Sequence, residues 1–175
     1  MLPVNEAKDL AVILAAFTGM GLGIYNFLRE KKKDKVRLKV IPKTVVQRSE
    51  GINGGLSLSS TTEFDPKQNA GLFGIEIINM SDFSIVVNQV GFIKRGSDRR
   101  LSIIKPILDD SGEWPRKLEP RESVSAYGLV PELIKSNALH LVTKAYVATA
   151  CGEVRTGKNK ALSELIAWGK VLHNN

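Results

Sequence analysis

The sequence has few of the side chains that carry metal and nucleophilic chemistry. Its 175 residues include one cysteine, Cys151, and two histidines, His140 and His173. A single cysteine excludes an intrachain disulfide, and two histidines without a second cysteine argue against a zinc site. A cysteine nucleophile also needs a base and an orienting group, and the sequence spacing assigns neither to Cys151. We therefore interpret Cys151 as a small packed residue in a turn.

Aromatic residues are also scarce, at 6% of the chain, and they do not alternate with basic residues. Proteins that bind single-stranded nucleic acid use such alternation, because bases stack on aromatic rings beside charges that hold the backbone. The basic residues Arg95, Arg99 and Arg100 flank one expected hairpin and are more typical of a solvated turn. These observations argue against nucleic acid as a partner.

Charge is missing from one long stretch, Leu10 to Leu28, which reads LAVILAAFTGMGLGIYNFL. At about 1.5 Å per residue a helix of this length crosses a hydrocarbon core of about 30 Å. The preceding tail, residues 1–9, is balanced to acidic, and the run has no small-residue cleavage site at its end. Both features argue against a cleaved signal peptide. The sequence predicts a transmembrane helix over residues 10–28 that makes this a single-pass membrane protein.

A basic juxtamembrane segment, residues 29–39, follows the apolar run. It holds seven basic and two acidic residues, whereas residues 1–28 hold one basic and two acidic ones. Because basic flanks stay on the cytoplasmic side, we expect the N-terminus outside and the C-terminal domain in the cytoplasm. Membrane lipids are then expected partners, since anionic headgroups attract such charges. The side chains assigned to the headgroups are Arg29, Lys31, Lys32, Lys33 and Lys35.

Small residues recur at four-residue spacing inside the apolar run, at Ala15, Gly19 and Gly23. Four residues are close to one helical turn, so the three lie on one helix face. Small residues let two membrane helices approach closely. This pattern indicates a homo-oligomer formed through the transmembrane helix.

Residues 40–160 carry an apolar pattern with a period of two, which predicts a β-sandwich. A long loop is expected over residues 50–69, which are rich in glycine, serine and threonine. Residues 161–175 show helical periodicity after Asn159, an expected N-cap, and predict a short amphipathic C-terminal helix. The predicted strands cover residues 36–40, 72–80, 85–94, 99–107, 122–129, 139–148 and 153–156.

Three segments carry a resemblance to a protein family. They read NMSDFSIVVNQVGF, WPRKLEPRESVSAY and AYVATACGEVRTGK. In this order they resemble uncharacterised bacterial proteins with a small immunoglobulin-like β-sandwich, in which an asparagine ends one strand and V-G-F closes the next. The resemblance covers roughly residues 72–158 and implies a mainly β fold of bacterial or phage origin. Arg121 stands where the family's turn has glycine, and the resemblance transfers no functional residue.

The segment GEVRTGKN, residues 152–159, nearly matches a phosphate-binding loop and makes Lys158 a candidate ligand for nucleotide phosphates. Asn159 replaces the hydroxyl residue that would hold magnesium, and too little chain follows for the parallel sheet that such loops need. An acidic group, Asp109, Asp110 and Glu113, has too few alternating oxygen ligands for calcium. No cofactor is therefore expected.

These observations predict a membrane-anchored binding or scaffold module without a catalytic site, presenting a β-sandwich to a protein partner at the cytoplasmic membrane face. A nucleotide-dependent enzyme or factor that uses Lys158 is one alternative. An extracytoplasmic adhesion-type domain is the other, and it requires the reversed topology.

Overall fold

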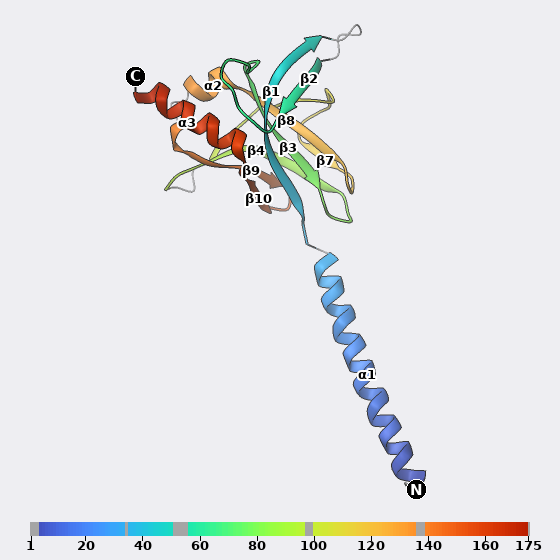
Figure 1. Ribbon diagram of the computed structural model, residues 1–175. Coiled ribbons are helices and arrows are strands. Elements are labelled where there is room, and N and C mark those ends of the chain that lie inside the picture. The colour runs from blue at the N-terminus through green and yellow to red at the C-terminus, as the bar shows by residue number, and fades with distance from the viewer. Residues whose placement is uncertain (1–3, 34, 51–55, 97–99, 136–138, 175) are drawn as a thin grey trace. The chain divides into compact units, whose positions relative to one another are not determined.

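The computed structural model describes residues 4–33, 35–50, 56–96, 100–135 and 139–174. Contacts divide the chain into two compact units, Met1–Lys35 and Val36–Asn175. Figure 1 shows the first unit as one helix and the second as a β-rich body with helices beside its sheets.

The first unit is helix α1, Val4–Lys33. It extends beyond the predicted span of residues 10–28 at both ends. Within it, Val12–Lys31 is long and apolar enough to cross a membrane, and none of this stretch is buried in the protein. Phe17, for example, is 64% exposed. A helix this apolar on all faces has no soluble core to enter, and its composition fits a membrane span.

Two antiparallel sheets build the second unit, which is mainly β. The first sheet has the order β2-β1-β3-β8-β6. Its strands are β1 (Leu38–Glu50), β2 (Leu56–Thr61), β3 (Leu72–Asn79), β6 (Ile107–Leu108) and β8 (Ser123–Leu129). The second sheet has the order β10-β9-β4-β5, and β7 also pairs with β4. Its strands are β4 (Ile85–Lys94), β5 (Arg100–Ser102), β7 (Arg116–Leu118), β9 (Val142–Thr149) and β10 (Val154–Gly157).

Both sheets contribute side chains to one hydrophobic core. Phe73 of β3 and Phe92 of β4 are fully buried, and their ring centroids lie 6.0 Å apart. Ile75 and Ile77 alternate with the half-buried Glu76 along β3, so the period-two pattern points apolar side chains inward. Each such fully buried side chain contributes about 1.5–3 kcal/mol.

Three short helical elements complete the second unit. They are α2 (Val130–Lys135), the 3-10 turn η1 (Leu139–Leu141) and α3 (Lys160–Asn174). Helix α3 buries Leu162 and Leu165 in the core, and Trp168 packs on Phe64 with ring centroids 5.6 Å apart. The predicted C-terminal helix is therefore an integral part of the β-rich unit.

Asn79, in the first of the three family-like segments, is a buried residue that holds a turn together. Its Nδ2 donates to the carbonyl oxygens of Phe83 at 2.8 Å and Leu118 at 3.1 Å. Its Oδ1 accepts from the backbone N–H of Ser81 at 2.9 Å. Because these bonds satisfy a fully buried amide, asparagine here closes the end of β3 and has a structural role.

Three predicted segments differ in the structure. The expected strand over residues 139–148 begins as the 3-10 turn η1, which contains His140, so β9 starts only at Val142. The expected loop over residues 50–69 contains strand β2, which pairs with a β1 that reaches Glu50; residues 51–55 lie outside the described chain. The expected strand over residues 99–107 is interrupted between β5 and β6, and Arg99 lies outside the described residues. Strand β7 and helix α2 were not predicted, since both are too short for a periodic signal.

Candidate functional site

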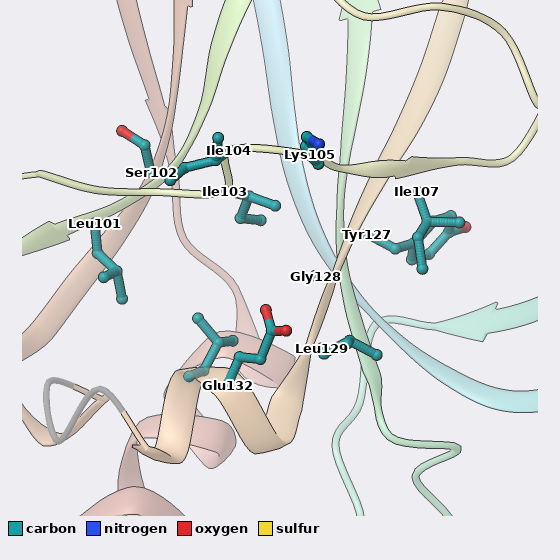
Figure 2. A pocket seen from close by; sticks show the side chains of 11 residues that line it. Leu101, Ser102, Ile103, Ile104, Lys105, Ile107, Tyr127, Gly128, Leu129 and Glu132 are labelled. Carbon is teal, nitrogen blue, oxygen red and sulfur yellow. The ribbon is translucent and has the colours of Figure 1, made fainter.

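The β-rich unit carries an apolar groove of about 470 Å³, which we call the β5–β6 groove. Its walls come from β5, the link to β6, strand β8 and helix α2. Figure 2 shows Glu132 pointing its carboxylate toward the space between Ile103 and Leu129. The lining residues are Leu101, Ser102, Ile103, Ile104, Lys105, Ile107, Tyr127, Gly128, Leu129, Glu132 and Leu133.

The groove exists because the chain leaves one sheet and enters the other at this point. Ile103 is tied to the second sheet by its backbone N–H, which donates to the Val90 carbonyl at 2.8 Å. On the opposite wall, a Cβ on Gly128 would lie 3.1 Å from the Ile103 side chain. Glycine at position 128 therefore lets the link between β5 and β6 lie close to β8.

Open strand edges flank the groove. In the described part of the chain β5 and β6 are the terminal strands of their sheets, so each has one edge without a neighbouring strand. Such an edge presents backbone N–H and C=O groups that can pair with another extended chain. Ile104, on the link between them, is 85% exposed. The groove thus combines apolar side chains with available backbone groups.

Lys158 and its neighbours form a hairpin and a helix cap. Val154–Gly157 is strand β10, paired antiparallel with β9, so its backbone is engaged in a sheet. A Cβ on Gly157 would overlap the Val40 carbonyl of β1, which explains this glycine by packing. Asn159 caps α3, because its Oδ1 accepts from the Leu162 N–H at 3.2 Å. Residues 152–159 therefore lack the phosphate-cradling loop that the motif suggested.

Cys151 and the two histidines lie at opposite ends of β9. Cys151 is exposed in the turn after β9, and its Sγ lies 3.0 Å from Thr149 Oγ1. This hydrogen bond lowers the pKa of the Cys151 thiol below its ordinary value. His140 precedes β9 and stacks on His173, with ring centroids 4.0 Å apart. The structure does not bring the cysteine and a histidine together as a nucleophile and its base.

The acidic cluster serves local structure. Asp110 forms an ion pair with Arg116 and accepts from the Gly112 N–H at 2.9 Å. Asp109 Oδ1 accepts from the Ser125 N–H at 3.2 Å, which fixes the end of β6 beside β8. Across the described ranges, no group of three or more histidine, cysteine or acidic side chains is arranged to hold a metal ion.

Two of the arginines considered for nucleic-acid binding, Arg95 and Arg100, make different contacts in the structure. Arg100 lies over the Tyr146 ring, 5.2 Å from its centroid. Arg95 lines a second, polar pocket together with Lys158. The sequence did not indicate that Arg95 and Lys158 line the same pocket, because they are 63 positions apart.

The predicted membrane-facing residues lie on or just after α1. Ala15, Gly19 and Gly23 are exposed, and a Cβ on either glycine would meet nothing within 4 Å. Helix α1 also carries Arg29, Lys31, Lys32 and Lys33, whereas Lys35 follows it; the side chains of Lys32 and Lys33 lie outside the described set. Lys31 Nζ sits 5.2 Å from the centroid of the Phe27 ring.

No family model, no curated protein and no solved structure matches this chain significantly. The β5–β6 groove was missed by sequence reasoning, since it depends on how β5, β8 and α2 meet in space.

Proposed function

We propose that the chain is a single-pass membrane-anchored binding module that presents an immunoglobulin-like β-sandwich at the cytoplasmic membrane face. The observation that carries this proposal is α1, whose stretch Val12–Lys31 is apolar and wholly unburied. Leaving such a surface in water is costly, because each square ångström of apolar area favours burial by about 25 cal/mol. A bilayer supplies an environment in which this surface is buried.

Strand order supports the immunoglobulin-like part of the proposal. The run β1-β3-β8-β6 corresponds to strands A-B-E-D of that architecture, and β10-β9-β4 corresponds to G-F-C. Both sheets share one core cluster, as two packed sheets of a sandwich do. Strand β2 is an addition at the edge of the first sheet.

The cytoplasmic orientation rests on charge asymmetry. Residues 29–39 carry seven basic side chains against one in residues 1–28. Each lysine or arginine near an anionic surface contributes about 1 kcal/mol. A reversed orientation would instead favour an adhesion-type role outside the cell.

Alkaline carbonate extraction tests the anchor. Full-length chain should stay with the membrane pellet, whereas Val36–Asn175 should be found in the supernatant. A Leu14→Lys/Ile24→Lys variant should be released in part, since each lysine deep in the span costs about 2.5–3.5 kcal/mol. Leu14→Ile/Ile24→Leu is the matched control and should behave as the native chain. Release of the native chain would refute the anchor, and digestion of the domain by protease in intact spheroplasts would refute the orientation.

For the binding role, we propose that the β5–β6 groove takes an extended peptide segment with apolar side chains. Open edges of β5 and β6 favour an added strand, whose backbone pairs while alternate side chains enter the groove. The apolar lining selects hydrophobic residues, and Glu132 favours a basic residue beside them.

Selection from a library of random short peptides against the full-length chain in nanodiscs tests this role. Enriched peptides should alternate apolar residues and include a lysine or arginine. Ile104→Asp and Leu129→Asp should each weaken their binding about tenfold, since each places a charge in an apolar contact. Val86→Asp is the control: Val86 is 40% exposed, close to the 39% of Leu129, but does not line the groove. Equal loss in all three variants would contradict the assignment of the groove.

A further inference from the structure

A second pocket, of about 220 Å³, is lined by basic side chains and hydroxyl groups, and we call it the basic pocket. It forms where five segments meet: the end of β4, η1, β9, the link from β10 to α3, and α3 itself. The lining residues are Arg95, His140, Val142, Thr143, Lys158, Ser163, Ile166 and Lys170. None of them is acidic, so the pocket gathers positive charge without internal neutralisation.

The acidic residue closest in sequence on α3 is engaged elsewhere. Glu164 Oε2 accepts from the Phe64 N–H at 2.8 Å, and its Oε1 lies 3.9 Å from Lys160. Lys160 in turn pairs with Glu63 at 2.7 Å. Among the described residues, no lysine or arginine that lines the basic pocket forms an ion pair.

Backbone contacts hold the pocket in shape. The Arg95 N–H donates to the Leu141 carbonyl at 2.7 Å, and Thr143 Oγ1 donates to the Ile93 carbonyl at 3.1 Å. Helix α3 packs tightly on η1, because a Cβ on Gly169 would lie 2.7 Å from Leu139. These contacts fix the backbone of β4, η1, β9 and α3, so little backbone ordering is needed when a ligand binds.

The nearby positive charges affect the pKa of His140, which lines the pocket. Partial burial lowers the pKa of His140, and the nearby His173, Lys170 and Lys94 lower it further. A fixed group of like charges destabilises the folded chain by self-repulsion. An anion in the pocket would relieve this repulsion.

We propose that the basic pocket binds a phosphate monoester. Such a group carries a charge of about −1.5 to −2 and three acceptor oxygens. Arg95 can offer a forked pair of N–H donors to two oxygens, while Lys158 and Lys170 act as point charges on the third. A volume of about 220 Å³ is below the 300–1,000 Å³ of ordinary small-molecule pockets, which fits a phosphate group better than a whole nucleotide. The same chemistry occurs in soluble phosphorylated metabolites and in phosphorylated lipid headgroups.

Calorimetric titration of full-length chain in phosphatidylcholine nanodiscs with inorganic phosphate tests the proposal. We expect saturable binding with one site per chain. The triple variant Arg95→Gln/Lys158→Gln/Lys170→Gln should weaken it at least about tenfold, because each charge-assisted hydrogen bond that is lost reduces affinity several-fold. A second variant, Lys158→Arg/Lys170→Arg, keeps the charges and should retain binding within about threefold. Lys144→Gln, which removes an exposed lysine of β9 outside the pocket, is the matched control.

Nanodiscs that contain phosphatidic acid distinguish the two sources. If the lipid fills the pocket, added inorganic phosphate binds more weakly there by competition, and the triple variant abolishes this difference. If affinity is unchanged, the phosphate comes from solution; both results support the site. Absence of saturable binding by the native chain would overturn it, as would equal weakening by the triple variant and by Lys144→Gln. Far-ultraviolet circular dichroism of each variant checks that the fold is intact. If the triple variant unfolds, the single variants Lys158→Gln and Lys170→Gln decide the question: each should weaken binding several-fold, and loss no greater than that of Lys144→Gln would overturn the site.

Discussion

At the scale of single residues, Arg121 adopts a backbone conformation that disfavours a side chain. Its φ is +68°, in the left-handed region that favours glycine, and it lies in the turn before β8. The ion pair of Arg121 with Asp82 at 3.5 Å is largely exposed and contributes little. The backbone N–H of Arg121 holds the turn by donating to the Asn79 carbonyl at 2.9 Å, but the arginine side chain adds no strong contact that offsets the strain.

Arg121→Gly should raise the free energy of unfolding of the β-rich unit by about 0.5–1 kcal/mol. This is the strain relieved by glycine minus the entropy that glycine adds to the unfolded chain. That gain corresponds to about 2–4 °C in Tm. Thermal unfolding followed by circular dichroism measures it. Arg121→Ala removes the same ion pair but keeps a Cβ, so it should show no gain; an equal rise in both variants would mean that strain is not the cause.

His140 makes stability depend on pH. Its pKa is lowered in the folded state by partial burial and by His173, Lys170 and Lys94, so the unfolded chain binds more protons near the ordinary histidine pKa of about 6.5. The folded chain therefore has its full stability above about pH 6.5, and part of it is lost as the pH falls below this value, because protonation of His140 favours the unfolded chain. Urea midpoints between pH 7.5 and 5.5, on the order of one unit either side of 6.5, should fall less in His140→Asn than in the native chain. Parallel curves would contradict this assignment.

At the scale of elements, α3 depends on one residue that joins it to the first sheet. Asn159 Oδ1 accepts from the Leu162 N–H, and Asn159 Nδ2 donates to the Pro42 carbonyl of β1 at 2.6 Å. The first bond caps the helix, while the second ties it to a strand far away in sequence. The two functions can be separated by substitution.

Asn159→Ala should lower the free energy of unfolding by about 1–3 kcal/mol, the sum of a lost cap and a lost hydrogen bond. Asn159→Ser keeps a capping oxygen and loses the donor to Pro42 without setting a second oxygen against that carbonyl, so its loss should be smaller. Urea unfolding of both variants gives the comparison. Equal losses would show that the bond to β1 carries the whole effect.

Sequence patterns predict an element well where its own residues determine it. The helical spacing of Leu162 and Leu165 after Asn159 predicted α3, and alternation predicted most of β3 and β4. Strand β2 escaped because its residues are small and polar, and its conformation comes from pairing with β1. The β5–β6 groove escaped for the same reason: Ile103 and Gly128 meet only in the folded chain.

The basic pocket shows the same limit at a candidate site. Lys158 was a candidate phosphate ligand because of a loop motif, but the preceding residues of the motif form strand β10 and not a loop. Its neighbours in the pocket, Arg95 and Lys170, belong to segments that no local spacing connects. Sequence reasoning could find the individual charge, but only the packing of α3 on η1 and β9 brings the three together.

At the scale of the whole molecule, the chain consists of two compact units, Met1–Lys35 and Val36–Asn175; in the function that we propose, the first anchors and the second binds. A binding module held at a membrane meets its partners at a raised local concentration, and pairing of two anchors would raise it further. Flexible tethers give effective concentrations in the millimolar range, so two weak grooves can act as one stronger receptor. Whether α1 self-associates therefore affects how the module binds.

The face formed by Ala15, Gly19 and Gly23 is the expected contact for such pairing. Both glycines leave the helix surface open, which would let a second backbone approach closely and gain van der Waals contacts that lipid does not match. Gly19→Ile and Gly23→Ile should each reduce association in a membrane two-hybrid reporter, because a branched side chain separates the helices. Leu22→Ile changes an exposed residue of α1 without adding volume and should leave the signal unchanged. An equal signal from all three variants would mean that the two glycines are merely tolerated on this face and do not form the contact between helices.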